Sequence, residues 1–361
     1  MVCKRYLPPS RLDSFLTTVD ACQKTIVGYS VEGRPIHMLQ MGSGDFKVLL
    51  WSQMHGNEST TTKALLDFIP WFLSEAQKSY QKAFSLYIIL QLNPDGANRY
   101  TRLNSNQVDL NRDAIQLTQP ESKVLRAQFE TLKPDLCLNL HGQRTIYAAG
   151  AGGASASLSF LAPAADEQRS LTAARKKAML LIASMAKPLA VDLPQGIGRY
   201  DDSFNPNCVG DYFTQSGTPT ILFEAGHAPG DYQREHTRTY ILKAYKLLFE
   251  QLLNPRPYEI EDYLNLPQNA VEFCDLIVTG VQIEDKGILK ADQQLAIQYV
   301  ENLVNGRIEF LSQFLQYGDT LELRAHKTLA LPVELQSIPL AFKKEELLKK
   351  SKFTALFSVK S

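Results

Sequence analysis

The chain has 361 residues, of which 44% are hydrophobic and 21% are charged, and its 38 basic residues balance 38 acidic ones. This is the composition of an ordinary globular protein, long enough for one large domain and a smaller one. A net charge of zero argues against binding to nucleic acid or to an anionic membrane. No stretch approaches the ~18 apolar residues of a membrane-spanning helix.

The five cysteines are scattered, at positions 3, 22, 137, 208 and 274. An odd number without close pairs predicts reduced thiols and excludes a disulfide framework or a CxxC metal site. The N-terminal stretch MVCKRYLPPSRLDSF has basic residues but lacks the apolar segment of a signal peptide, so we expect a cytoplasmic protein.

Apolar runs alternate with helical patterns over the first two thirds of the chain. The expected segments, in chain order, are a strand over 46–54, a helix over 59–79, a strand over 84–92, a turn at NPDG (93–96), a polar loop over 97–118, a helix over 120–132, a strand over 135–140, a mobile glycine-rich loop over 148–157, a helix over 166–187, a strand over 218–224 and a helix over 235–253. Continuous apolar strands between helices predict an α/β domain, with a mainly parallel mixed sheet covered by helices on both faces.

The pattern changes after NPRPYEIED (254–262). Short β-rich runs follow, and Asn305-Gly306 between alternating residues is typical of a hairpin. We therefore expect a large domain over 1–254 and a small β-rich domain, whose role the sequence leaves open, over 263–361. The charged stretch 342–361 is expected to be a loosely held tail.

Four polar residues share one kind of position: His55, Glu58, His141 and Glu224 each lie at, or just after, the C-terminal end of an expected strand. In an open parallel sheet those ends face one crevice, where ligands bind. Two histidines and a glutamate suit a catalytic zinc ion, which keeps an open position for water. A further carboxylate can then act as general base for that water.

Each of these residues also has an ordinary structural interpretation. A single His-x-x-Glu is common by chance, and Glu224 could pair with an arginine such as Arg234. Their shared location is what favours a site. His227 is a rival ligand, ranked below His141 because it lies beyond the strand end. The remaining histidines are expected to be structural or exposed: His37, His236 and His326.

The polar loop 97–118 carries Arg99, Arg102 and Arg112, with Asn111 among them. A solvated loop is the plain interpretation, but this loop is longer than structural connections usually are, and long ordered loops are often functional. Arginine suits bidentate carboxylate recognition and oxyanion stabilisation. Together with a zinc site, the loop indicates hydrolysis of an acyl bond in a substrate that carries a carboxylate.

Five motifs in the same order resemble the zinc metallocarboxypeptidases of the carboxypeptidase A type. They are HGNE, NPDG, TRLNSNQVDLNRD, LNLHGQ and ILFEAG, preceded by GYSVEGRPIHMLQMG, and the resemblance covers roughly residues 20–250. It implies that His55, Glu58 and His141 hold one zinc ion per chain.

The same resemblance implies roles for four more residues. Glu224 is implied as the general base, and Arg102 as the arginine that polarises the scissile carbonyl. Asn111 and Arg112 are implied to hold the terminal carboxylate of the substrate.

Members of this family also use a mobile tyrosine about twenty residues before the base. Tyr200, which precedes Glu224 by 24 residues, fits better than Tyr212 at 12. The chain departs from the family at Asp113 and at Gly142-Gln143, so the resemblance does not imply a preferred substrate side chain.

The leading hypothesis is a zinc metallocarboxypeptidase that hydrolyses peptides with a free C-terminal carboxylate. The alternative is a zinc-dependent N-acyl amino acid deacylase of the succinylglutamate desuccinylase or aspartoacylase type. A third hypothesis, a non-catalytic binding module, would be signalled by loss of a ligand or of the base, and neither is lost. We expect no nucleic-acid or membrane partner. Because every candidate residue precedes 240, the sequence also predicts that 263–361 is dispensable for the chemistry.

Overall fold

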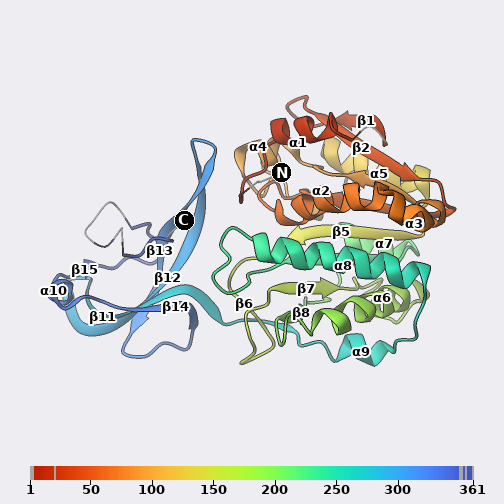
Figure 1. The fold of residues 1–361 in the computed structure, drawn as a ribbon. Helices are drawn as coiled ribbons and strands as arrows, with labels where there is room; N and C mark the ends of the chain where they lie inside the picture. The colour runs from red at the N-terminus through yellow and green to blue at the C-terminus, as the bar shows by residue number, and fades with distance from the viewer. Residues whose placement is uncertain (1–3, 20–21, 349–352, 354–355, 360–361) are drawn as a thin grey trace.

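The computed structural model describes residues 4–19, 22–348, 353 and 356–359, and consists of a larger α/β part beside a β-rich part (Figure 1). The α/β part contains an eight-stranded sheet in the order β1-β2-β4-β3-β5-β9-β7-β8. Its strands are β1 (Gln23–Tyr29), β2 (Pro35–Gly42), β3 (Phe46–Ser52), β4 (Phe84–Ile89), β5 (Leu136–Gly142), β7 (Leu158–Leu161), β8 (Ile197–Arg199) and β9 (Thr220–Ala225). The central strands β4, β3, β5 and β9 are parallel, and antiparallel pairs flank them. The predicted α/β fold with a mixed sheet is confirmed.

Helices cover both faces of this sheet (Figure 1). Successive residues of β3 show why: Leu50 packs into one hydrophobic core, while Leu49 and Trp51 pack into a second. The larger core includes α2 (Thr60–Leu73), α6 (Ala173–Leu189) and α8 (Glu235–Leu253), and the smaller includes α5 (Pro120–Leu132) and α7 (Val209–Gln215). The other short helices of this part are α1 (Pro9–Leu16), α3 (Lys78–Ala83), α4 (Pro94–Arg99) and α9 (Ile260–Leu264), with 3-10 turns η1 (Glu75–Gln77) and η2 (Leu110–Arg112).

Some local expectations differ from the structure. The expected NPDG turn is the start of α4, where Asn93 accepts a hydrogen bond from the Gly96 amide at 2.8 Å and Pro94 occupies the first turn. Asparagine and proline are favoured at the start of a helix as well as in turns, so the same residues are compatible with either structure. The expected mobile loop 148–157 is partly strand, because β6 (Tyr147–Ala149) pairs with β10 (Asn269–Val271).

The β-rich part has its own sheet and core. Its elements are β11 (Phe273–Asp285), β12 (Ile288–Val304), β13 (Arg307–Gly318), β14 (Arg324–Ala330), α10 (Val333–Gln336) and β15 (Leu340–Ala341). The predicted hairpin at Asn305-Gly306 joins β12 to β13, and both residues have positive φ, 48° and 74°, as a tight two-residue turn requires. Within the expected loose tail, Phe353 and Phe357 are buried in this core; residues 349–352, 354–355 and 360–361 lie outside the described residues.

The segment between the two parts belongs by its contacts to the α/β part. Tyr263 of α9 is fully buried, joins the larger core, and its hydroxyl accepts a hydrogen bond from the Ala162 amide at 3.1 Å. The division into 1–254 and 263–361 stays a prediction. The four described cysteines are free thiols. Within the described residues, no helix combines the length and apolar character needed to cross a bilayer.

The larger core yields a stability prediction at Phe249, which is fully buried and stacks on Phe68 with ring centroids 5.3 Å apart. Phe249→Ala should lower the free energy of unfolding by about 3–5 kcal/mol, because it removes buried contacts and leaves a cavity. Lys243→Ala, on the exposed side of the same helix, breaks only a surface ion pair with Asp192 and should change it by less than about 1 kcal/mol. Urea unfolding measures both, and equal effects would contradict the assigned packing.

Candidate active site

The four polar residues at strand ends come together at one edge of the sheet. His141 and Glu224 are directly opposed in the β5–β9 ladder, and His55 follows β3 by three residues. A cavity of about 840 Å³ lies at this edge, and all four side chains line it. Figure 1 shows the arrow of β5 pointing toward the β-rich part, so the cavity lies where the two parts meet.

A tight turn after β3 places His55 and Glu58 on the same side. The Glu58 amide donates to the His55 carbonyl at 3.1 Å, and α2 begins two residues later. The turn packs so closely on α4 that a Cβ at Gly56 would lie 2.0 Å from the Gly96 carbonyl carbon. Glycine at position 56 is therefore required for this turn, because any side chain would force the backbones apart.

The metal-competent atoms of His55, Glu58 and His141 converge. One Glu58 oxygen lies 3.0 Å from His55 Nδ1, the other lies 3.0 Å from His141 Nδ1, and the two Nδ1 atoms are also 3.0 Å apart. Both histidines are buried, and ligand atoms of all three lie within 4.8 Å of one another. Two imidazoles and one carboxylate are the donor set of many catalytic zinc sites, so these residues fit a zinc ion.

Two charged residues support this triad from the polar loop. Asp109 Oδ1 lies 2.9 Å from His55 Nε2, the ring nitrogen that faces away from Glu58. Carboxylates in this position fix the orientation of metal-binding histidines. Arg102 donates to Glu58 at 3.1 Å and to Asp109 at 3.0 Å. Burial alone would raise the pKa of Asp109. His55 and Arg102 outweigh this effect and hold that pKa below its usual value.

Glu224 is buried, and its Oε2 has no hydrogen-bond partner within the described residues. Burial raises the pKa of this carboxyl well above its usual value, and the nearby Glu58 raises it further. A buried carboxylate oxygen without a partner is costly. Here it faces a cavity that water or a substrate can enter.

The predicted carboxylate-binding pair lies in η2. The Asn111 amide donates to Asp109 Oδ1 at 2.9 Å, which ties η2 to the residue that orients His55. Arg112 is exposed, lines the cavity, and forms no ion pair in the part of the chain that the structure describes. It therefore offers a guanidinium to an incoming anion.

The structure separates the residues that sequence spacing left as rivals. Tyr200 lines the cavity, and its hydroxyl is 2.9 Å from that of Tyr147. Tyr212 instead lies under Arg126, 3.7 Å from the guanidinium carbon to the ring centroid. His227 packs against Tyr232 and His326, away from the three-residue cluster.

Several residues at or beside the cavity were not predicted from the sequence. Asp109 could have been found from its place in DLNR, two residues before Asn111. Asn139 is buried at the cavity surface, and both atoms of its amide lack partners within the described residues. Arg5 and residues 298–301 also line the cavity, and no local pattern marks them. Residues 298–301 belong to the segment 263–361, which was expected to be dispensable for the chemistry.

His141 and His227 provide a matched pair for testing the metal ligands. His141→Ala should abolish stoichiometric zinc binding, because it leaves two of three protein ligands. His227→Ala removes the same side chain outside the cluster and should leave zinc content unchanged in the folded fraction. Metal analysis of the purified variants measures both. Full occupancy in His141→Ala, or loss in His227→Ala, would reverse the assignment.

Comparisons with known proteins show a family match and a shared fold. Residues 13–148 match the zinc carboxypeptidase family Peptidase_M14. Carboxypeptidase SOL1 of Arabidopsis thaliana is 28% identical over 139 residues, and the match spans 32% of this chain but only 28% of that protein.

Solved structures share the fold at low sequence identity. A metallo-carboxypeptidase from Burkholderia cenocepacia superposes with a TM-score of 0.54 at 15% identity, over 69% of each chain. One from Pseudomonas aeruginosa, in complex with (2-guanidinoethylmercapto)succinic acid, gives 0.56 at 17% identity, over 68% of this chain and 69% of that one. Residues 13–148 are thus similar to the zinc carboxypeptidase family, and the α/β part shares its fold with solved metallo-carboxypeptidases.

Proposed function

We propose that the protein is a metallocarboxypeptidase that removes C-terminal residues from peptides and holds one zinc ion per chain. The observation that carries this proposal is the position of Arg112. It lines the same cavity as the His55, Glu58 and His141 cluster and has no carboxylate partner within the described residues. A planar cation beside a hydrolytic centre suits a substrate whose carboxylate lies near the scissile bond.

His55, Glu58 and His141 would hold the zinc ion, which when bound makes water a stronger acid and polarises a carbonyl group. The Glu224 carboxylate, with one oxygen free, accepts the proton of the attacking water. It then passes the proton to the leaving amine as the C–N bond breaks. The opposed positions of Glu224 and His141 in the sheet keep this base beside the ligands.

The arginines of the polar loop divide two tasks. Arg102, already within hydrogen-bond distance of Glu58, donates to the oxygen that gains negative charge. Arg112, helped by the side chain of Asn111, holds the terminal carboxylate and so sets which bond reaches the metal. The Tyr200 hydroxyl donates to Tyr147 in this structure, and it would donate to the peptide by exchanging that partner for a substrate carbonyl.

A second candidate is a deacylase acting on N-acyl amino acids. The observation in its favour is that residues 298–301 close one side of the cavity, which leaves less room for a peptide. The same residues would act in the same roles, because both substrates present an acyl–nitrogen bond next to a carboxylate. A panel of peptides and N-acyl amino acids separates the two. Activity on N-acyl amino acids alone would favour the deacylase.

Glu224→Gln should keep zinc content and fold but lower kcat by about 10²–10⁴-fold, because the amide cannot accept the proton. The matched control is Glu130→Gln, an exposed residue of α5 whose partner is Arg126 on the same helix. Steady-state kinetics with one peptide measures both variants. A kcat within a few-fold of wild type would reject Glu224 as the base.

Arg112→Ala should lower kcat/KM by about one to two orders of magnitude, since a charge-assisted hydrogen bond contributes roughly 1.5–3 kcal/mol. Amidating the substrate's C-terminus should do similar damage, and the two losses should overlap because both delete one contact. Arg99→Ala, from the start of the same loop and paired with Glu32, serves as the control. Equal hydrolysis of free-acid and amidated peptides by the wild-type enzyme would contradict the carboxypeptidase proposal.

A further inference from the structure

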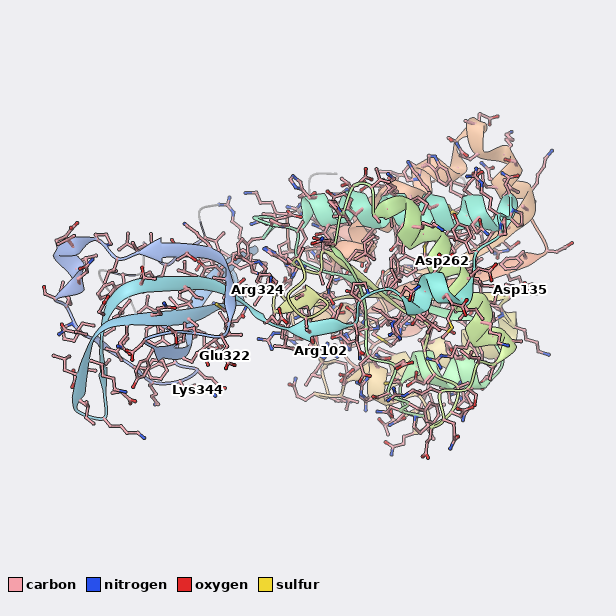
Figure 2. The ribbon with its side chains drawn as sticks, turned by 90° about the horizontal axis from the view of Figure 1, so that it is seen from below. Arg102, Asp135, Asp262, Glu322, Arg324 and Lys344 are labelled. Atoms are coloured by element: carbon pink, nitrogen blue, oxygen red, sulfur yellow. The ribbon has the colours of Figure 1, made fainter. Side chains whose placement is uncertain are left out.

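One side of the active-site cavity is formed by the β-rich part. Residues 298–301 of β12, here called the β12 wall, line the cavity together with the candidate ligands, and Gln313 of β13 joins them. The expectation that 263–361 is dispensable for the chemistry stays a prediction, because lining the cavity does not give these residues a role in the reaction. Figure 2 shows Arg102 at the end of the α/β part nearest the β-rich part and Asp135 at its other end. The β12 wall and Arg102 line the same cavity.

An ion pair between the first and last thirds of the chain holds one end of the β12 wall. Glu301 accepts two hydrogen bonds from the Arg5 guanidinium, at 2.6 and 3.0 Å, and another from the Tyr100 hydroxyl. Burial alone would raise the pKa of Glu301, but Arg5 outweighs it and lowers that pKa. The Arg5 carbonyl in turn accepts from Ser59 at 2.6 Å, beside the ligand Glu58.

Asp275 and Thr145 hold the other end. Asp275 is almost fully buried and accepts from the Tyr299 amide at 2.7 Å and from the side chain of Gln298. Gln298 also donates to the Thr145 hydroxyl at 2.7 Å, and His326 Nε2 lies 2.7 Å from the Thr145 carbonyl oxygen. The β12 wall is thus fixed at both ends, and a substrate cannot push it aside without breaking buried hydrogen bonds.

The β12 wall and Arg112 line the same cavity and connect to the metal cluster through different contacts. Asp109 connects His55 to η2, which carries Arg112. Ser59, next to Glu58 in the chain, donates to the Arg5 carbonyl, and Arg5 in turn donates to Glu301 of the wall. With the terminal carboxylate at Arg112 and the scissile bond at the cluster, the preceding residues of a peptide would occupy the rest of the cavity, which the wall lines in part.

We propose that the β12 wall limits how many residues a substrate can carry before the scissile bond, so that short peptides are preferred over long ones. This inference rests on the proposed function. The cavity volume of about 840 Å³ falls in the range of ~300–1,000 Å³ typical of small-molecule pockets. Fixed groups that collide with the wrong substrate are an established source of specificity.

The test uses the full-length zinc enzyme and free-acid peptides from a tripeptide to a dodecapeptide that share the same last three residues. For the wild type, kcat/KM should fall by about tenfold or more from the shortest to the longest. Gln298→Ala, which removes a wall side chain, should reduce this length preference. Val300→Trp, which adds bulk to the wall, should lower kcat/KM even for the tripeptide. The control is Gln316→Ala, which changes an exposed glutamine of β13 outside this cavity. It should change neither the length preference nor kcat/KM for the tripeptide.

The outcomes separate the inference from the function it rests on. Equal kcat/KM at every length overturns the inference and leaves the carboxypeptidase proposal intact. A length preference that neither wall variant moves, with zinc content and circular dichroism unchanged, also overturns the role of β12. If zinc is bound but no peptide of any length is cut, both proposals fail.

Discussion

The site depends on one carboxylate, that of Glu58, buried between two imidazoles. Its oxygens lie 3.0 Å from a nitrogen of His55 and of His141, and it also accepts from the Gly142 amide at 2.9 Å and from Arg102. Burial would raise the pKa of Glu58, but the two histidines outweigh it and lower that pKa well below its usual value. A buried anion requires such partners. Meeting that requirement joins the ends of β3 and β5, the start of α2 and the polar loop at one point.

The cations around the cavity differ in how far the protein neutralises them. Arg102 is balanced by Glu58 and Asp109, and Arg5 by Glu301. Arg112 is left without an ion pair in the part of the chain that the structure describes. In a molecule whose formal net charge is zero, this places a local positive charge at the position proposed to bind the substrate carboxylate. Arg144 and Arg234 also line the cavity, and neither forms an ion pair within the described residues, so short-range recognition comes from these local cations and overall charge contributes little.

Sequence alone predicted what local patterns encode. Apolar runs located β3, β5 and β9, and strand ends located His55, His141 and Glu224, because the carboxyl ends of parallel strands meet at one edge. The Asn305-Gly306 hairpin followed from its turn chemistry. Glu301 could not be predicted in this way. It occupies an ordinary position in a long strand, and its partner Arg5 lies 296 residues away, so only the tertiary fold shows that it lines a cavity.

That separation also sets an order of events during synthesis. The residues proposed to bind metal and to take the proton have all left the ribosome well before position 301, and at ~5–20 residues per second the delay is several seconds. Until then Arg5 lacks its acidic partner Glu301. A nascent chain stopped after α8 would carry every proposed catalytic residue around an open cavity. Completion of the last third therefore adds no proposed catalytic residue. It adds one side of the cavity that surrounds the proposed catalytic residues.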